Sequence, residues 1–187
     1  MTRIVAGTHG GRRLAAPSGP GTRPTSDRVR EALFSTLDAM VDLDGARFAD
    51  LYAGSGAVGL EALSRGAAHV LLVESDFRAA RTIRANLAAL GAGTAARLVM
   101  AKVATVLDGG PDGEPYDVVF ADPPYPMPDE DVAAMVRALV RGGWLAADAV
   151  LVVERSTRTG PIPQVEGVTE VRGRRYGETT LWYGRRS

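Results

Sequence analysis

Apolar residues recur along this chain at two spacings, one typical of β-strands and the other typical of α-helices. Five short apolar runs predict buried strands, at 46–53, 70–74, 97–101, 116–121 and 150–154. Three segments between them carry apolar residues at helical spacing, at 58–64, 77–90 and 129–140. Strand and helix therefore alternate, and such alternation predicts a parallel sheet with helices on both faces.

The two ends of the chain depart from this alternation. Near the N-terminus, the runs at 3–7 and 12–15 flank a Gly-rich turn and predict a small β-hairpin. Near the C-terminus, the runs at 169–172 and 179–183 have a turn between them but no helix, so we expect them to pair antiparallel at one edge of the sheet. The expected fold class is α/β, with a mostly parallel seven-stranded sheet and a small N-terminal hairpin extension.

A connector rich in Gly and Pro, at 17–24, divides the chain into two regions. Beyond it, a helix is expected to begin at Thr25 or Ser26, either of which can cap its N-terminus. An apolar stripe then follows at helical spacing, formed by Val29, Leu33, Leu37 and Met40. We therefore expect a basic N-terminal appendage over residues 1–24 and one α/β domain over residues 25–187.

The composition excludes several kinds of chemistry. The 187 residues include no cysteine and two histidines, which excludes thiolate zinc sites, cysteine nucleophiles and iron–sulfur clusters. No apolar run approaches the roughly 18 residues of a membrane span, and the N-terminus lacks the apolar core of a signal peptide. We expect a cytoplasmic monomer with no metal ion and no membrane partner.

The formal net charge of zero conceals two basic ends. Residues 1–30 have a net charge of +5 and residues 172–187 of +4, so the middle of the chain carries −9. All but one of the 22 basic residues are arginine, whose guanidinium pairs well with phosphates and with guanine edges. This segregation of charge predicts a polyanionic partner.

A glycine-rich segment, Gly54-Ser55-Gly56-Ala57-Val58-Gly59, follows the first predicted strand of the sheet. Its glycines allow a tight turn and let a ligand approach the backbone N–H groups at the start of the next helix. Glu74 ends the next strand, from where a carboxylate can accept hydrogen bonds from both hydroxyls of a ribose. The same spacing fits an NAD site, but Asp50, four residues before the first glycine, suits a cationic or amine-bearing ligand better than a pyrophosphate.

The tetrapeptide Asp122-Pro123-Pro124-Tyr125 follows the apolar run at 116–121, at the sheet edge where α/β proteins bind ligands. The exocyclic amine of a nucleobase is a poor nucleophile because its lone pair is delocalised into the ring. The Asp122 carboxylate and the Pro123 carbonyl can accept hydrogen bonds from such an amine and free its lone pair. The prolines fix the backbone, and Tyr125 offers a face on which a base can stack.

Together, the two motifs resemble class I S-adenosylmethionine-dependent methyltransferases that act on amino groups, which have a Rossmann-like fold. More narrowly, nearly the whole chain is similar to the RsmD family, bacterial methyltransferases of guanine N2 in 16S ribosomal RNA. Outside the two motifs, the similarity rests on two further regions. Near the N-terminus these are residues 3–7 with Gly11-Arg12, residues 23–25 and residues 27–34, and near the C-terminus they are residues 176–179 with Leu181 and Tyr183.

The resemblance implies S-adenosyl-L-methionine as the cofactor. Its methionine part would lie against the glycine loop with Asp50 near its amino group, Glu74 would hold its ribose, and backbone at Lys102-Val103 would lie near its adenine. Many such proteins have an acidic or polar residue near the adenine, where this chain has Ala101-Lys102. The expected cofactor-binding residues are Thr25, Asp50, Ala53, Gly54, Ser55, Gly56, Gly59, Glu74, Ser75, Lys102, Val103 and Asp122.

The resemblance also implies the substrate, the N2 amine of one guanine in 16S ribosomal RNA, guanine 966. The RNA would be bound free, in the small ribosomal subunit or in an assembly intermediate. The expected catalytic residues are Asp122, Pro123, Pro124 and Tyr125, acting by in-line transfer to an unpaired or flipped base. The arginines expected to contact RNA phosphates are Arg3, Arg12, Arg13, Arg23, Arg28, Arg30, Arg174 and Arg175.

Other functions share part of this pattern. Adenine-N6 and cytosine-N4 amino-methyltransferases of DNA or RNA share Asp-Pro-Pro-Tyr, but the DNA enzymes usually carry a large target-recognition region, for which this chain has no room. Protein glutamine methyltransferases usually have Asn where Asp122 stands. A non-catalytic nucleic-acid-binding module is disfavoured, because both the ligand motif and the catalytic motif are intact.

Overall fold

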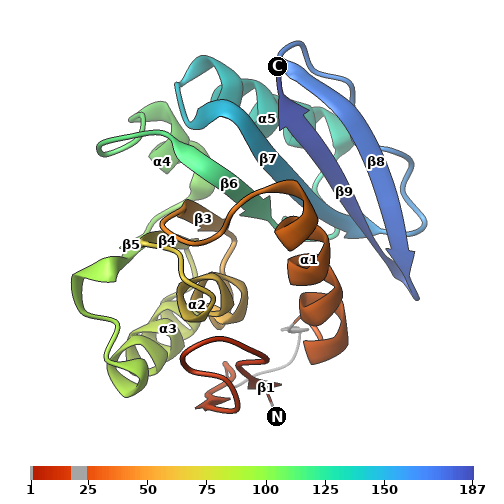
Figure 1. Ribbon diagram of the computed structural model, residues 1–187. Coiled ribbons are helices and arrows are strands. Elements are labelled where there is room, and N and C mark those ends of the chain that lie inside the picture. Colours follow the sequence, from red (N-terminus) through yellow and green to blue (C-terminus); the bar gives the residue numbers. More distant parts are fainter. Residues whose placement is uncertain (1, 18–24) are drawn as a thin grey trace.

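The structure is a computed structural model, which describes residues 2–17 and 25–187. The strands of its main sheet are β3 (Arg47–Leu51), β4 (His69–Glu74), β5 (Ala96–Met100), β6 (Tyr116–Ala121), β7 (Leu145–Ser156), β8 (Val168–Tyr176) and β9 (Thr179–Arg186). In the described part of the chain this sheet has seven strands, in the order β5-β4-β3-β6-β7-β9-β8 (Figure 1). The strands from β5 to β7 are parallel, and β9 and β8 add antiparallel at one edge. The expected fold class is confirmed.

Helices cover both faces of the sheet (Figure 1). One layer contains α1 (Asp27–Met40), α2 (Ala57–Ser64) and α3 (Phe77–Leu90), and the other contains α4 (Val103–Asp108) and α5 (Asp129–Arg141). Successive side chains of a strand point to opposite faces. Phe48, Val118 and Val152 therefore pack on the α1 side, while their sequence neighbours Ala49, Val119 and Val153 pack on the α5 side.

The start of α1 follows from its sequence. Ser26 is the N-cap residue, and its side-chain oxygen accepts a hydrogen bond of 3.2 Å from the backbone N–H of Val29. Leu33 and Leu37, from the predicted apolar stripe, are fully buried against the sheet. This cap and this stripe hold the first residues of α1 over the carboxyl edge of the central strands.

The predicted N-terminal hairpin is present, with strands β1 (Thr2–Arg3) and β2 (Arg13–Leu14) that are shorter than the apolar pattern predicts. Ile4 and Leu14 form a small core with residues of α2 and α3. The hairpin therefore packs against these two helices, below α2 and beside α3 in Figure 1. The connector expected at 17–24 lies, except for Pro17, outside the described residues.

Most predicted helices and central strands begin and end within two residues of the observed ones. β8 and β9 extend further than predicted, to Tyr176 and Arg186, and β7 and α4 do not follow the prediction. β7 begins at Leu145, five residues before the predicted strand. Its pairing with β6 shifts register between Tyr116 and Val118, and Asp148 has a φ of 60°. This irregular first part has no alternating apolar pattern. The helix α4 spans six residues, too few to show helical spacing.

The order of the strands reverses next to β3. β4 and β5 follow β3 on one side, whereas β6 and β7 lie on its other side. Ligands of open α/β sheets bind at such a point, outside the carboxyl ends of the strands. The glycine loop after β3 and Asp122 after β6 both lie there, so the fold brings the two sequence motifs together.

Candidate active site

Three acidic side chains lie near the carboxyl ends of three adjacent strands: Asp50 in β3, Asp122 directly after β6, and Glu154 in β7. The alternation of each strand places all three on the sheet face covered by α1 and α2. Asp50 is 1% exposed and Glu154 is 8% exposed, while Asp122 is partly buried. The edge of the sheet therefore concentrates negative charge where solvent screening is weak.

Asp50 ties the start of α2 to the sheet. Its carboxylate accepts a hydrogen bond of 2.9 Å from the backbone N–H of Gly59. A Cβ atom at Gly59 would lie 2.8 Å from the Leu72 side chain and 3.0 Å from that of Val70. Gly59 thus serves close packing of helix on strand, and it lies behind the loop rather than on its open side.

The open side of the glycine loop is at Gly54. Gly54 and Gly56 have φ values of 59° and 82°, in the region that favours glycine. A Cβ atom at Gly56 would lie 3.3 Å from the side chains of Ile83 and Leu72, whereas one at Gly54 would meet no atom within 4 Å. The backbone at Gly54 can therefore be approached closely by a ligand.

Glu74 holds the glycine loop against β4. Its two carboxylate oxygens accept hydrogen bonds of 2.8 Å each, one from the backbone N–H of Gly54 and one from that of Asp76. A carboxylate offers about four acceptor positions, so both oxygens keep capacity for further donors. This geometry fits a ribose whose hydroxyls bind the outer side of the carboxylate.

The loop that carries Asp122 is fixed at both ends. The backbone N–H of Asp122 donates to the carbonyl of Leu51 at 3.3 Å. Further along, the buried guanidinium of Arg155 donates to the Met127 carbonyl at 2.9 Å and contacts the Asp129 carboxylate at 3.2 Å. Between these ends Tyr125 is 52% exposed, so its ring is available to a planar ligand.

Burial raises the pKa of Asp50 well above its usual range, and the hydrogen bond from Gly59 only partly opposes this. Burial likewise raises the pKa of Asp122, and the charges of Glu154 and Asp50 raise it further. A ligand that brings positive charge or N–H donors would relieve this concentration of acceptors.

A cleft of about 470 Å³ opens in front of Asp122. It is bounded by the loop after β6, by the start of α1, by Glu154 and by the turn between β8 and β9. A smaller hollow beside the glycine loop shares Thr25 and Asp122 with this cleft, and its lining also includes Asp50, Ala53, Gly54 and Ser55. The Thr25 hydroxyl donates to Glu154 at 3.3 Å, which joins the start of α1 to β7.

Three further residues expected to bind the cofactor, Ser75 and the adenine-side pair Lys102-Val103, lie at the ends of β4 and β5. Ser75 and Lys102 are exposed and Val103 is buried at the start of α4. Two exposed apolar side chains lie at the same edge, Phe77 at 63% and Met100 at 46%. Met100 is the register partner of Glu74. This chain has Ala101-Lys102 where many such proteins have an acidic or polar residue, but the apolar side chains at this edge offer a surface on which an adenine ring can pack.

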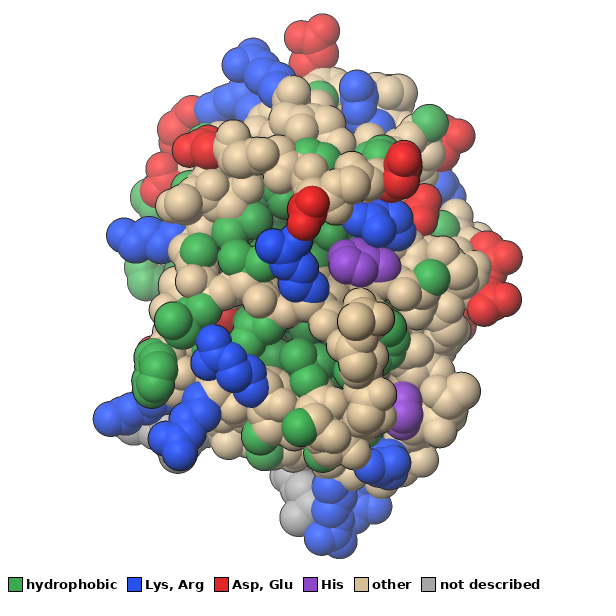
Figure 2. Space-filling model, turned by 90° about the vertical axis from the view of Figure 1, so that its left-hand side faces the viewer, with side chains coloured by type: hydrophobic (Ala, Val, Ile, Leu, Met, Phe, Trp, Pro, Cys, Tyr) green, Lys and Arg blue, Asp and Glu red, His purple; other side chains and the backbone are tan. Residues whose placement is uncertain are grey.

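The arginines expected to contact RNA lie in three places. Most of them are exposed on the hairpin, on α1 and on β8: Arg3, Arg12, Arg13, Arg28, Arg174 and Arg175. Figure 2 shows basic side chains at the lower end of the face beside β5, the end at which the hairpin lies. Arg23 lies outside the described residues.

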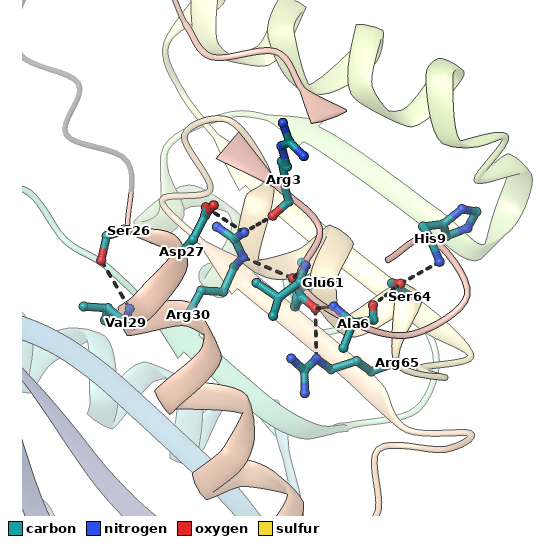
Figure 3. A network of polar contacts seen from close by, with 12 residues as sticks. Arg3, Ala6, His9, Ser26, Asp27, Val29, Arg30, Glu61, Ser64 and Arg65 are labelled. Carbon is teal, nitrogen blue, oxygen red and sulfur yellow. Dashed lines mark hydrogen bonds and ion pairs between the residues drawn. The ribbon is translucent and has the colours of Figure 1, made fainter. Parts of the chain in front are cut away.

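The expected phosphate contact of Arg30 is corrected by the structure. Arg30 is 0% exposed, and its guanidinium contacts the Glu61 carboxylate at 3.2 Å, the Asp27 carboxylate at 3.0 Å and the carbonyl of Arg3 (Figure 3). Burial removes Arg30 from the surface, so it is an internal link between α1, α2 and the hairpin. The sequence did not indicate that Arg30 is buried, because it lies in the basic segment 1–30 together with arginines that are exposed.

Sequence reasoning did not single out Glu154, Phe77, Met100 or Arg155. For Glu154 a signal existed, because the predicted strand at 150–154 ends in this acid just as the strand at 70–74 ends in Glu74. Arg155 carried no such signal, because its partners on the loop after β6 are brought to it only by the tertiary fold.

Within residues 2–17 and 25–187, no helix is both long and apolar enough to cross a membrane. The same residues contain no group of three or more His, Cys, Asp or Glu side chains arranged to hold a metal ion.

Comparison with known proteins places the chain in a family. The family described as conserved hypothetical protein 95 matches residues 2–185. The ribosomal RNA small subunit methyltransferase D of Escherichia coli K12 is 43% identical over 158 residues, which cover 84% of this chain and 76% of that protein.

Solved structures agree with this placement. The structure of the Escherichia coli protein YhhF superposes with a TM-score of 0.85 at 35% identity, and the match covers 99% of this chain and 97% of that one. An RNA methyltransferase from Salinibacter ruber in complex with S-adenosyl-L-homocysteine shares the fold, with a TM-score of 0.62 at 16% identity over 87% of this chain and 93% of that one. The chain belongs to the ribosomal RNA small subunit methyltransferase D (RsmD) family.

Proposed function

We propose that the protein transfers a methyl group from S-adenosyl-L-methionine to the exocyclic N2 of one guanine in 16S ribosomal RNA, guanine 966 by its resemblance to the RsmD family. One observation carries the proposal. The hollow beside the glycine loop and the cleft in front of the Asp122 loop share Thr25 and Asp122. A donor bound in the first and a base bound in the second would therefore meet at Asp122.

The residues around the glycine loop fit the donor. Gly54 presents backbone that a ligand can approach, Asp50 supplies negative charge for an amino group, and Glu74 keeps acceptor capacity for the ribose hydroxyls. Phe77 and Met100 offer apolar surface for the adenine. S-adenosyl-L-methionine supplies a methyl group on a positively charged sulfur, which leaves as a neutral thioether.

The loop after β6 fits the acceptor base. The Asp122 carboxylate and the Pro123 carbonyl accept hydrogen bonds from the two N–H groups of N2, and Tyr125 stacks on the ring. Transfer forms a bond from N2 to the methyl carbon and breaks the bond from that carbon to sulfur. One N2 proton then passes to Asp122 or to water. Catalysis thus rests on positioning and on hydrogen bonding of the amine.

The substrate base must leave any base pair to enter this cleft. The exposed arginines of the hairpin, with Arg28 of α1 and the pair on β8, would hold the RNA by its phosphates from either side of the cleft. The relatives named as ribosomal RNA small subunit methyltransferases support this class of substrate.

The test is transfer of label from S-adenosyl-L-methionine to unmodified 16S RNA and to small ribosomal subunits, followed by identification of the labelled nucleoside. N2-methylguanosine is expected. Label in N6-methyladenosine, N4-methylcytidine or protein would replace the proposal with one of the alternative amino-methyltransferases.

Asp122→Ala tests the assigned role of Asp122 in the same assay. We expect transfer to fall by about a thousandfold, since an acceptor that acts on the reacting amine is lost, while S-adenosylhomocysteine still binds. Asp108→Asn, a change at an exposed aspartate of α4, is the control and should transfer normally. Full turnover by Asp122→Ala would refute the role.

A further inference from the structure

Glu154 lies beside Asp122 in the cleft but has no part in the chemistry described so far. The parallel strands β6 and β7 pair Ala121 with Val153, so the next residues along the two strands, Asp122 and Glu154, are lateral neighbours. Neighbouring strands lie about 4.8 Å apart. The charge of Glu154 acts directly on Asp122, which agrees with this short separation.

Glu154 is held in a defined place on the wall of the cleft. Its side chain is 8% exposed, and its carboxylate accepts the hydrogen bond from Thr25 at 3.3 Å. Asp122, Pro123 and Tyr125 line the same cleft. A carboxylate with about four acceptor positions can accept from Thr25 and from a ligand at the same time.

The Watson–Crick edges of the nucleobases differ in what they offer to such a carboxylate. Guanine presents N–H donors at both N1 and N2, side by side. Adenine and cytosine each present an exocyclic amine next to a ring nitrogen that is an acceptor. A carboxylate next to the amine site therefore gains a hydrogen bond from guanine, whereas it faces a lone pair on adenine or cytosine.

Resting on the proposed function, we propose that Glu154 selects guanine by accepting a hydrogen bond from its N1–H while Asp122 accepts from its N2 amine. The two adjacent carboxylates match the two adjacent donors of the guanine edge. In this arrangement Asp122 serves the reacting amine, and Glu154 determines which base is accepted. The tie to Thr25 fixes the acceptor before the base arrives, so no reorganisation is needed on binding.

The experiment compares two target bases in the RNA that the labelling assay identifies. One RNA has guanine at the target, and the other has 2-aminopurine, which keeps the N2 amine but has an unprotonated N1 and no O6. The ratio of kcat/KM for the two RNAs is measured for the wild-type protein, for Glu154→Gln and for Glu114→Gln, a control at an exposed glutamate in the loop before β6.

The wild-type protein and Glu114→Gln are expected to prefer guanine by at least a hundredfold, because a site built around a donor rejects the analogue that lacks it. In Glu154→Gln this preference should shrink by roughly ten- to a hundredfold, the value of one hydrogen bond to a charged group. The contribution of O6 cancels in this comparison, because both proteins see the same two bases.

A purely structural role for Glu154 predicts a different result. Loss of structure lowers kcat/KM for both RNAs by the same factor, and an unchanged ratio in Glu154→Gln would overturn the proposal. If Glu154→Gln no longer binds S-adenosylhomocysteine, the test rests on the wild-type protein. Equal kcat/KM of the wild-type protein for the guanine RNA and the 2-aminopurine RNA would also overturn the proposal. Failure of the proposed function is distinct, because the wild-type protein would then label no guanine N2 at all.

Discussion

Buried acids at two places in the molecule, within α2 and at the sheet edge, have opposite electrostatic surroundings. Glu61, in the middle of α2, accepts hydrogen bonds from the backbone N–H groups of Val5 and Ala6 and pairs with Arg30 and Arg65 at 3.2 and 2.9 Å (Figure 3). At the sheet edge, Asp50 and Asp122 form no ion pair within the described residues, and burial raises the pKa of each. Arginines of the protein itself neutralise Glu61, whereas no cation of the described residues pairs with Asp50 or Asp122.

This difference separates a structural site from a binding site. A buried carboxylate whose cations and donors are all supplied by the chain, like Glu61, holds elements together and has little to offer a ligand. Carboxylates gathered without such cations weaken the folded protein and gain most when a ligand brings donors. Removing a carboxylate should therefore destabilise the protein at the first site and stabilise it at the second.

The largest effect is expected for Glu61→Gln. The amide replaces one acceptor oxygen by a donor, which faces the N–H groups of Arg30, Arg65 and the hairpin. Breaking a buried pair in this way costs about 3–5 kcal/mol. Chemical denaturation measures the free energy of unfolding, and Glu31→Gln, at an exposed glutamate of α1, should change it by less than about 0.5 kcal/mol. A loss for Glu61→Gln as small as that of the control would show that the network does not bear on stability.

A smaller effect is expected when the hairpin arginines Arg12 and Arg13 are both changed to Glu. Both are exposed, unlike Arg30, and the hydrogen bond of 2.5 Å that Arg12 donates to the Ala89 carbonyl lies at the surface, so their loss should largely spare the fold. Affinity for 16S RNA should fall by about tenfold, with a weaker dependence on salt, because phosphate contacts are lost. Affinity for S-adenosylhomocysteine should stay unchanged, as measured by calorimetry. Equal loss of both affinities would contradict an RNA-binding role of the hairpin.

The smallest effect is expected for Asp122→Asn, on stability. The folded protein holds a proton on Asp122 more tightly than the unfolded chain does, so the wild-type protein loses stability as pH rises through the raised pKa. Asn removes this loss, and the melting temperature at pH 7 should rise by a few degrees. The gain should fade as pH falls toward the usual carboxyl pKa, where the wild-type Asp122 is protonated as well. A variant that melts below the wild-type protein at pH 7 would show that the Asp122 carboxylate stabilises the fold.

The sequence predicted the parts of the fold that depend on local pattern. The helix at 77–90 and the strand at 116–121 have the observed bounds, because the spacing of their apolar residues marks each of them locally. The residues of the glycine loop and of the Asp122 loop could also be singled out, since each motif is contiguous. Their convergence follows from the alternation of strand and helix, which predicts a common carboxyl edge.

What the sequence did not reveal depends on contacts between distant segments. Arg30 lies in a basic stretch and was expected at the surface. It is buried instead, because its guanidinium pairs with the carboxylate of Glu61, which is 31 residues away in the sequence. Arg155 and Glu154 are adjacent in sequence but serve opposite faces, one fixing the loop after β6 and the other facing the cleft. Such roles depend on which strands become neighbours, and the apolar pattern does not specify that order.

The position of β9 between β7 and β8 bears on how the protein is made. β8 leaves the ribosome first, yet the strand that it pairs with among the described residues is β9, which is synthesised after it. Until then β8 is unpaired, and in the finished sheet it is an edge strand, where exposed charged side chains, among them Arg172 and Arg174, discourage pairing with other chains. The cleft takes its lining from Thr25 to Thr179, so a nascent chain has no complete site before the hairpin of β8 and β9 is in place.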